Sequence, residues 1–307
     1  MSAGADHGTK PMMDQLIVQS LILGLLQGGL YALLAVGLSL VFGILRVVNF
    51  AHGEFAMLGS FAAVFAVTSF GMPAWAALIA AAAAGALVAL ITNVVVLRPI
   101  YLSRMRQKGE YTIIATFMLS QFLIAATTVL FGTTYRNLPG LWESNLNFFD
   151  YVYLSGNRLV AFSAAIVMIG TLFWIVYRTD TGRAWRALTQ SPLGASVVGI
   201  DIHKYANYAF LVSGAFAGLA AGLLAPLMFV FPSSGVVALV KAFIVVIIGG
   251  MGSIGGALAA GLLLGVVEVM GTIFVASGYT DAYGFALMIA VLLLRPAGLF
   301  GKMGRAI

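Results

Sequence analysis

Residues 16–45 read LIVQSLILGLLQGGLYALLAVGLSLVFGIL, a run of about 30 positions without one charged side chain. Wound as one helix, such a run would be about 45 Å long, against about 30 Å for the hydrocarbon core of a bilayer. It is long for one span and short for two, and glycines offer possible break points at Gly24, Gly28, Gly29 and Gly37. In either form the run predicts helix that crosses a membrane.

The rest of the chain has the same character. Of 307 residues, 62% are hydrophobic and 8% are charged, whereas soluble domains carry about 25% charged residues. This composition excludes soluble, disordered and nucleic-acid-binding proteins. The strands of a membrane β-barrel would alternate apolar and polar residues, and these runs do not. The predicted fold class is all-α, a polytopic helical bundle in a membrane.

Further apolar runs follow the first, separated by short polar stretches. They cover residues 55–70, 74–97, 112–131, 159–177, 205–230, 242–267 (as a hairpin) and 282–294. We therefore expect about eight transmembrane helices, some of them broken or re-entrant. Residues 1–13 are polar or small and are expected to be a disordered tail, and residues 14–307 to form a single transmembrane domain.

Lysine and arginine are unevenly shared between the connections. They crowd residues 98–111, 178–204 and the C-terminus, whereas 132–158 and 230–241 hold few. Cytoplasmic loops carry the excess of positive charge, so the first three are expected inside a bacterial inner membrane and the other two outside. The net charge of +6 is explained in this way without a nucleic acid. The orientation of the N-terminus stays open, because it depends on whether residues 16–45 are one span or two.

Catalytic and metal chemistry are not expected in this chain. It has no cysteine, and its histidines, His7, His52 and His203, lack the close spacing of a helical metal site. We expect a pore-forming subunit without enzymatic activity, with no metal and no cofactor of its own.

A polar segment, RVVNFAHGE at residues 46–54, separates two apolar runs without a turn-rich loop. Polar groups near a bilayer are costly unless they are paired or line water. Asn49, His52 and Glu54 are therefore expected to line a translocation pathway or to brace a broken helix. The alternative is an interfacial loop that meets lipid headgroups.

Three other polar side chains are candidates for the pathway, and Gln27 and Tyr31 are the weaker ones. Gln27 and Tyr31 lie one turn apart on one helix face, and Glu268 is an isolated charge in an apolar helix. An intramembrane carboxylate usually faces the bundle interior and marks a pathway or a structural pair.

Glycines cluster just before Glu268. Small residues allow helices to approach closely, and we favour this packing role over substrate contact. No Gly-Lys-Ser/Thr follows, so a phosphate-binding loop is excluded. The packing glycines are Gly249, Gly250, Gly252, Gly255 and Gly256.

The connection TDTGRAWRALTQSPLGASVVGID, residues 179–201, is long for a helix–helix loop. Its apolar residues lie between basic ends, outside the bilayer core, which predicts a protein partner; a short helix on the headgroups is the alternative. The apolar residues expected at the surface are Ala184, Leu188, Leu193, Val197 and Val198, with Arg183 and Arg186 on a polar rim.

Four segments in register resemble one family. They are GLSLVFGILRVVNFAHGEFAMLG (37–59), the 179–201 connection, IIGGMGSIGGALAAGLLLGVVE (247–268) and LLLRPAGLFGK (292–302). Together they are similar to the permease subunits of branched-chain amino acid ABC importers, of the LivH type, and the resemblance covers residues 13–302.

The resemblance implies a type II importer-like permease and a set of partners. These are a second homologous permease (LivM-like), two cytoplasmic ABC ATPases (LivG/LivF-like) that bind ATP and Mg²⁺, and a periplasmic substrate-binding protein (LivK-like). The 179–204 connection would be the ATPase-coupling loop, with Gly182, Arg183, Arg186, Ala187, Ala195, Gly199 and Asp201 as its contact residues.

Other functions were weighed against this interpretation. Permeases for urea and short amides share much of the pattern. An ion-coupled secondary transporter would explain Glu268 but not the long loop, and a purely structural subunit would not explain Asn49, His52 and Glu54. The polar intramembrane residues are few, which favours an aliphatic amino acid over urea; they are Gln27, Asn49, His52, Asn93, Gln121 and Glu268.

Overall fold

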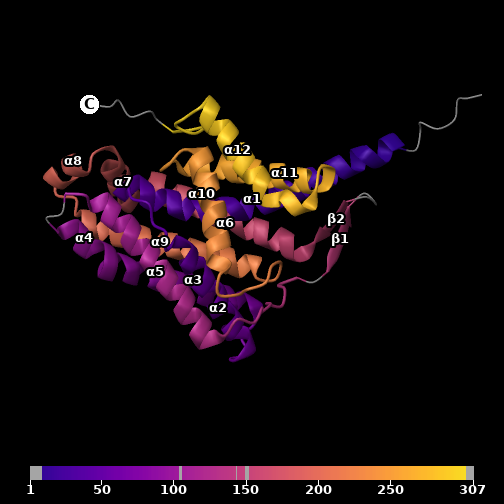
Figure 1. The fold of residues 1–307 in the computed structure, drawn as a ribbon, viewed down its shortest axis with the longest axis horizontal. Coiled ribbons are helices and arrows are strands. Elements are labelled where there is room, and N and C mark those ends of the chain that lie inside the picture. Colours follow the sequence, from indigo (N-terminus) through magenta and orange to yellow (C-terminus); the bar gives the residue numbers. More distant parts are fainter. Residues whose placement is uncertain (1–8, 104–105, 143, 149–151, 302–307) are drawn as a thin grey trace, which may run out of the picture.

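The computed structural model describes residues 9–103, 106–142, 144–148 and 152–301, which form a helical bundle (Figure 1). The principal helices, in chain order, are α1 (Thr9–Leu45), α2 (His52–Thr68), α3 (Ala74–Ile91), α5 (Lys108–Phe131), α6 (Gly156–Arg178), α9 (Ile202–Leu224), α10 (Ser234–Gly249), α11 (Ile254–Phe274) and α12 (Thr280–Leu294). The short elements are η1 (Thr92–Leu97), α4 (Arg98–Leu102), β1 (Asn145–Phe148), β2 (Val152–Ser155), α7 (Asp180–Gln190), α8 (Pro192–Val197) and η2 (Ser277–Tyr279).

The first apolar run is one continuous helix, which settles the alternative left open by its length. Its glycines do not break α1 but receive α11: a Cβ at Gly24 would press on the backbone of Val266, and one at Gly28 on the backbone of Gly261 and Leu262. Small residues thus let the two antiparallel helices touch along their length. The helix begins at Thr9, so the expected tail is wrong for residues 9–13, while residues 1–8 lie outside the described part.

Seven helical segments of the described chain are long and apolar enough to cross a membrane, and α2 and α10 are shorter apolar helices. The prediction of an all-α polytopic bundle with some incomplete spans is confirmed. The expected outer connection 230–241 is wrong in part, because α10 begins at Ser234. Lys241, counted there as a loop residue, lies in the middle of that helix.

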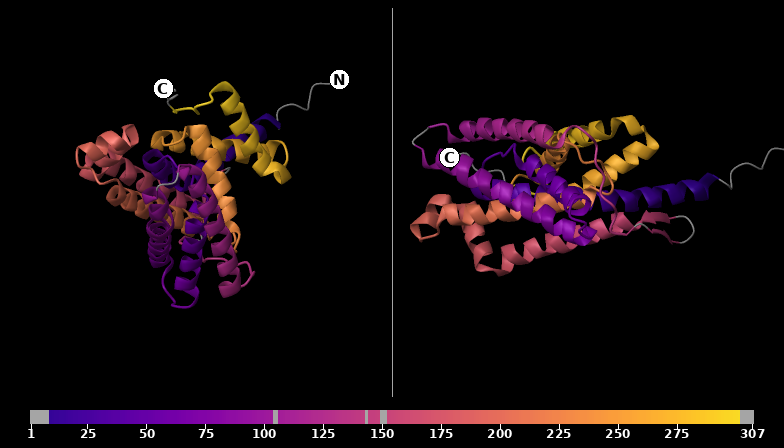
Figure 2. Two further views of the ribbon diagram at one scale, coloured as in Figure 1. Left: turned by 60° about the vertical axis from the view of Figure 1, so that its left-hand side comes forward. Right: turned by 90° about the horizontal axis from the view of Figure 1, so that it is seen from below.

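The bundle has two distinct ends (Figures 1 and 2). We call the end that carries α4, α7 and α8 the loop end, and the end that carries the β1–β2 hairpin the hairpin end. α6 runs from the hairpin directly to α7 and so joins the two ends. The connections 98–111 and 178–204, predicted to share one side of the membrane, do lie at one end.

The C-terminal segment returns to the loop end. The amides of Leu299 and Phe300 donate to the carbonyls of Ile248 and Gly249 at 2.8 and 3.1 Å. Ile248 and Gly249 lie in the last turn of α10, where carbonyls have no amide donors within the helix. The C-terminal segment supplies these donors. Residues 302–307, including two of the predicted basic positions, lie outside the described residues.

Close contacts between small residues also bind α2 and α3 to α9. A Cβ at Gly85 would overlap the carbonyl of Gly214, and one at Gly218 would overlap that of Ala81. α3 continues through the π-helix η1 into α4, and within η1 Asn93 donates to Asn207 Oδ1 of α9 at 2.7 Å. This amide pair gives the polar Asn93 a partner inside the apolar bundle.

Candidate functional site: buried polar clusters and an exposed loop

One buried cluster joins α1, α10 and α11. Tyr31 Oη donates to Glu268 Oε2 at 2.8 Å, and Lys241 Nζ lies 2.5 Å from Glu268 Oε1. Lys241 also pairs with Asp281 Oδ1 of α12 at 2.8 Å. The side chains of Lys241 and Glu268 are 8% and 2% exposed, whereas that of Asp281 is 74% exposed. The ion pair therefore runs from the surface into the bundle.

Sequence reasoning placed Tyr31 and Glu268 correctly in the interior but missed Lys241 and Asp281. A signal was present, because Lys241 and Glu268 are opposite charges in two neighbouring apolar runs and intramembrane charges usually pair. Gln27 is half-buried one turn before Tyr31. It does not line the cavity described below.

A second cluster is formed by residues 49–54, which we call the α2 entry. Asn49 Oδ1 accepts from the amide of Ala51, the residue before α2, at 3.0 Å, so this side chain closes an Asx turn that leads into the helix. His52 Nε2 lies 3.1 Å from the carbonyl of Leu34 in α1, which makes Nε2 the donor, and Nδ1 lies 3.5 Å from Ser213 Oγ in α9. Both Asn49 and His52 are buried.

Glu54 completes the α2 entry in a different way. Its Oε1 accepts from Ser120 Oγ of α5 at 2.9 Å, while the buried Oε2 has no hydrogen-bond partner among the described residues. Oε2 lies against Gly235 in the first turn of α10, where no Cβ would fit. The α2 entry thus contacts α1, α5, α9 and α10. Whether it lines a pathway or braces a helix stays a prediction.

A cavity of about 230 Å³ lies beside these clusters. We call it the Lys241 cavity. Its walls are mainly apolar, with polar atoms from Tyr31, Ser60, Ser234 and Lys241, and the remaining lining residues are Leu34, Ala56, Met57, Tyr135, Ala221, Leu224, Ala225, Met228, Phe229, Val230, Phe231, Val237 and Ala238. An antiparallel backbone bridge pairs Arg136 with Val230 and so joins the connection after α5 to the connection after α9.

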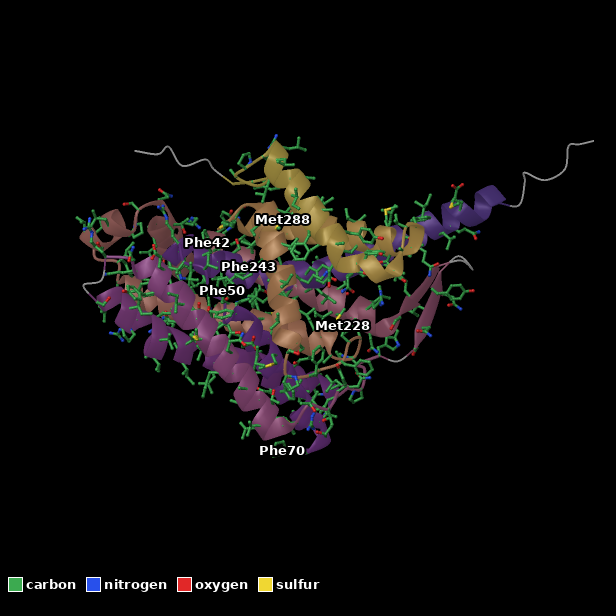
Figure 3. The ribbon with its side chains drawn as sticks, viewed as in Figure 1. Phe42, Phe50, Phe70, Met228, Phe243 and Met288 are labelled. Atoms are coloured by element: carbon green, nitrogen blue, oxygen red, sulfur yellow. The ribbon has the colours of Figure 1, made fainter. Side chains whose placement is uncertain are left out.

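A second hollow of about 240 Å³ lies nearer the loop end. We call it the Phe50 groove, since the Phe50 ring lies 5.4 Å from that of Phe243 across it. Figure 3 shows Phe42, Phe50 and Phe243 gathered there. The lining residues are Leu38, Phe42, Val48, Phe50, Phe243, Val246, Ile247 and Met251.

The helix α10 separates the Lys241 cavity from the Phe50 groove. Tyr31, Leu34, Leu38 and Phe42 form a single stripe of α1 that lines both of them. α10 presents Val237, Ala238 and Lys241 to the cavity, and its opposite face to the groove. An apolar path along α1 is therefore interrupted where α10 crosses it, next to the α2 entry.

The predicted coupling loop folds as α7 and α8. Thr179, Ser191 and Asp201 cap the helices that follow them: Thr179 Oγ1 accepts from Gly182 N at 3.1 Å, and Asp201 Oδ1 from His203 N at 2.8 Å. The amides of Lys204 and His203 hold the pKa of the Asp201 carboxyl below its usual range.

Several loop residues have other surroundings than expected. Ala184 and Leu188 are buried, so they are not part of an exposed surface, and Ala195 is buried as well. Trp185, not predicted to matter, is buried and donates to Tyr205 O at 2.9 Å. Arg186 donates to the Val176 carbonyl rather than standing free on a rim, while Arg183 is exposed and pairs with Asp180.

The exposed apolar residues of this loop lie on α8 and just after it. Leu193, Val197 and Val198 are 77%, 80% and 75% exposed. Gly199 follows with a φ of +86°, a conformation that favours glycine. Ala187 is half-buried against the core, and Gly182 contacts the last carbonyls of α6 so closely that a Cβ would not fit.

Four of the five glycines in the cluster are closely packed. A Cβ at Gly249 would overlap the backbone of Gly256, which closes the α10–α11 turn, and Gly252 faces Gly43 at the end of α1. Gly250, with a φ of +94°, lies against Gly301. A Cβ at Gly255 would fit, since its nearest neighbour would be the Phe173 ring at 3.9 Å. Within the described residues, no group of three or more His, Cys, Asp or Glu is placed to hold a metal ion.

Comparison with known proteins agrees with this architecture. The chain is 32% identical to the high-affinity branched-chain amino acid transport system permease protein BraD of Pseudomonas aeruginosa, over 93% of this chain and 96% of that one. It is 32% identical to the corresponding protein LivH of Escherichia coli, with the same coverage. It is 29% identical to LivM of Escherichia coli, over 88% of this chain and 67% of that one.

A family model described as branched-chain amino acid transport system / permease component matches residues 20–294. This range contains both buried clusters, both hollows and the α7–α8 loop. The chain is a multi-pass membrane protein, and it belongs to the family of permease components of branched-chain amino acid transport systems.

Proposed function

We propose that this chain is the pore-forming permease subunit of an ATP-driven ABC importer that moves branched-chain, aliphatic amino acids across the bacterial inner membrane. The observation that carries the proposal is the similarity to BraD and LivH over 93% of the chain, since their names state branched-chain amino acid transport. The mainly apolar lining of both hollows also suits an aliphatic cargo. The subunit itself breaks no bond.

The proposed complex holds a second permease, two ATPases and a substrate-binding protein outside the membrane. Similarity to both LivH and LivM supports pairing with a homologous permease. ATP and Mg²⁺ would be bound by the ATPases. The loop end and the C-terminus would face the cytoplasm, because lysine and arginine are concentrated there.

The ATPase contact is proposed to lie on α8. Leu193, Val197 and Val198 are exposed at the loop end, outside the apolar bundle, so a partner that covered them would remove apolar surface from water. α7 is packed through Trp185 and Arg186 against α9 and α6. A force on α8 would therefore be transmitted to those two helices.

The translocation route is proposed to follow the α1 stripe from the Lys241 cavity to the Phe50 groove. α10 and the α2 entry close it between the two hollows, so cargo passes only when α10 moves. Tyr31, Glu268, Asn49, His52 and Glu54 hold this closed arrangement through the contacts described above. Closure of the ATPases would shift the balance between closed and open states.

Reconstitution of the complete importer in proteoliposomes tests the proposed function. Radiolabelled leucine, isoleucine and valine should accumulate only with ATP and the binding protein, and urea should not accumulate. Uptake driven by an ion gradient without ATP would show a secondary transporter instead. Uptake of urea without the aliphatic amino acids would overturn the cargo and leave the importer class intact.

Thiol labelling tests the route. The chain has no cysteine, so a Ser60→Cys variant reports only on the Lys241 cavity and a Val246→Cys variant only on the Phe50 groove. A water-soluble thiol reagent should label the two sites in opposite nucleotide states of the importer. Equal labelling of both in every state would contradict a barrier at α10.

A further inference from the structure

The Lys241 cavity has mainly apolar walls, and Lys241, which lines it, also forms an ion pair that reaches the surface. Ligand sites are typically of this kind, mostly apolar with a few placed polar groups. Lys241 lines the cavity and pairs with two carboxylates, which differ strongly in exposure. The difference in exposure between the two carboxylates determines which of them a ligand can displace from Lys241.

The Glu268 pair is the fixed one. Both carboxylate oxygens of Glu268 are engaged, one by Lys241 and the other by Tyr31, and the side chain is buried. Opening this pair would leave an unpaired charge in an apolar interior, which is strongly unfavourable. The Asp281 pair is different, because the Asp281 carboxylate is 74% exposed and its release leaves no buried carboxylate unpaired, while Lys241 keeps Glu268 as a partner.

We propose that the Lys241–Asp281 pair is a docking site for the charged head of an α-amino acid. The carboxylate of the cargo replaces Asp281 on the Lys241 ammonium, and the released Asp281 carboxylate receives the cargo ammonium. One ion pair becomes two, with no change in net charge. The aliphatic side chain then lies in the cavity against Leu34, Val237 and Ala238.

This site would select zwitterions, and it deepens the proposed function on which it rests. Urea carries no charge and could not separate the pair. An amine without a carboxylate would leave Lys241 without its new partner, and a carboxylate without an amine would leave Asp281 without one. Each half-ligand should therefore bind more weakly than the complete amino acid.

Thermal unfolding of the purified permease–ATPase complex, without the binding protein, measures this site directly. A ligand that binds the folded state raises the unfolding midpoint. L-leucine at high concentration should raise it more than isoamylamine or 4-methylpentanoate, and urea should give no such stabilisation. Absence of any leucine effect on the wild type would overturn the site.

Two variants separate this site from the rest of the protein. Asp281→Asn changes an exposed side chain and should weaken leucine binding roughly tenfold or more, as expected for loss of a charge-assisted contact. Asp14→Asn, an exposed aspartate in α1, is the matched control and should bind leucine as the wild type does. Equal leucine stabilisation in both variants would overturn the proposal.

A double variant, Lys241→Met with Glu268→Gln, removes the buried pair together and should keep the fold while abolishing leucine stabilisation. Retained stabilisation in this variant would also overturn the site. Proteoliposome uptake by the wild type reports separately on the proposed function. Uptake of leucine together with unchanged binding in Asp281→Asn would refute the site and leave the transport function standing.

Discussion

The membrane-embedded clusters and the α7–α8 loop are opposites in their relation to the solvent. In the bundle, Lys241, Glu268 and Glu54 are charged or polar side chains surrounded by apolar residues. On α8, Leu193 and Val197 are apolar side chains exposed outside the bundle. Both arrangements cost free energy unless something compensates. In the bundle the compensation comes from neighbouring side chains, whereas on α8 we propose that it comes from another chain.

The bundle shows two degrees of compensation. Glu268 has a cation and a tyrosine within hydrogen-bond distance, whereas Glu54 has one serine and an oxygen without a partner among the described residues. Substitutions should therefore have different effects at the two acidic residues and on α8. The following predictions are ordered by the size of the effect expected.

The largest effect is expected for Lys241→Met. It leaves Glu268 buried without its cation, which should lower the free energy of unfolding by about 3–5 kcal/mol. Adding Glu268→Gln should recover most of this loss, since the stranded charge is then gone. Lys204→Met, the same change at an exposed lysine, should cost under about 0.5 kcal/mol. Unfolding in detergent micelles gives these values, and equal losses at Lys241 and Lys204 would contradict a structural ion pair.

A smaller effect is expected for Glu54→Ala. It leaves the Ser120 hydroxyl without its acceptor and empties the space beside Gly235, at a cost of about 1–3 kcal/mol. Glu54→Gln should be milder, because the amide oxygen can still accept from Ser120 and no cation is stranded. Leucine uptake should fall in Glu54→Ala and recover in Glu54→Gln. Wild-type uptake in both Glu54→Ala and Asn49→Ala would refute a role of the α2 entry in transport.

The loop side of the comparison is tested by Val197→Ser. If an ATPase covers this residue, loss of its buried apolar area should weaken association roughly tenfold. The stability of the permease alone should not change, because Val197 is exposed. Ser196→Ala, on the same short helix, is the control. Pull-down of the ATPases measures association, and unchanged binding by Val197→Ser together with Leu193→Ser would place the contact elsewhere.

The amino-acid sequence predicted the bundle because hydrophobic run length is a local property. It also placed Glu268 and the α2 entry in the interior, since isolated charges in apolar runs are themselves a signal. Lys241 was missed because the start of α10 was placed too late, which turned a helical residue into a loop residue. Helix boundaries are fixed by tertiary contacts, here those of Gly235 with Gly53 and Glu54 of the α2 entry.

The burial of residues in the α7–α8 loop was also only partly predictable from the sequence. The sequence predicted that the loop is amphipathic. It did not predict which of its apolar residues stay exposed. Ala184 and Leu188 are buried because α7 packs on α6 and α9 through Trp185 and Arg186. Only after that packing is known do Leu193, Val197 and Val198 remain as the exposed apolar residues of the loop.

The smallest effect is expected at Asp201, where the loop rejoins the bundle. Its carboxylate accepts from the amides of His203 and Lys204 at 2.8 and 3.2 Å and so caps α9. Asp201→Ala should lower the thermal midpoint slightly, and Asp201→Asn should not, because asparagine is an equally good cap. The pKa of Asp201 is lowered from 3.8 in the folded protein, so its contribution is complete above that pH and is lost as the pH falls through the lowered value. Amide exchange in the first turn of α9 should accelerate over that acidic range in the wild type and not in Asp201→Asn. The same acid response in both proteins would show that the cap does not depend on the carboxylate charge.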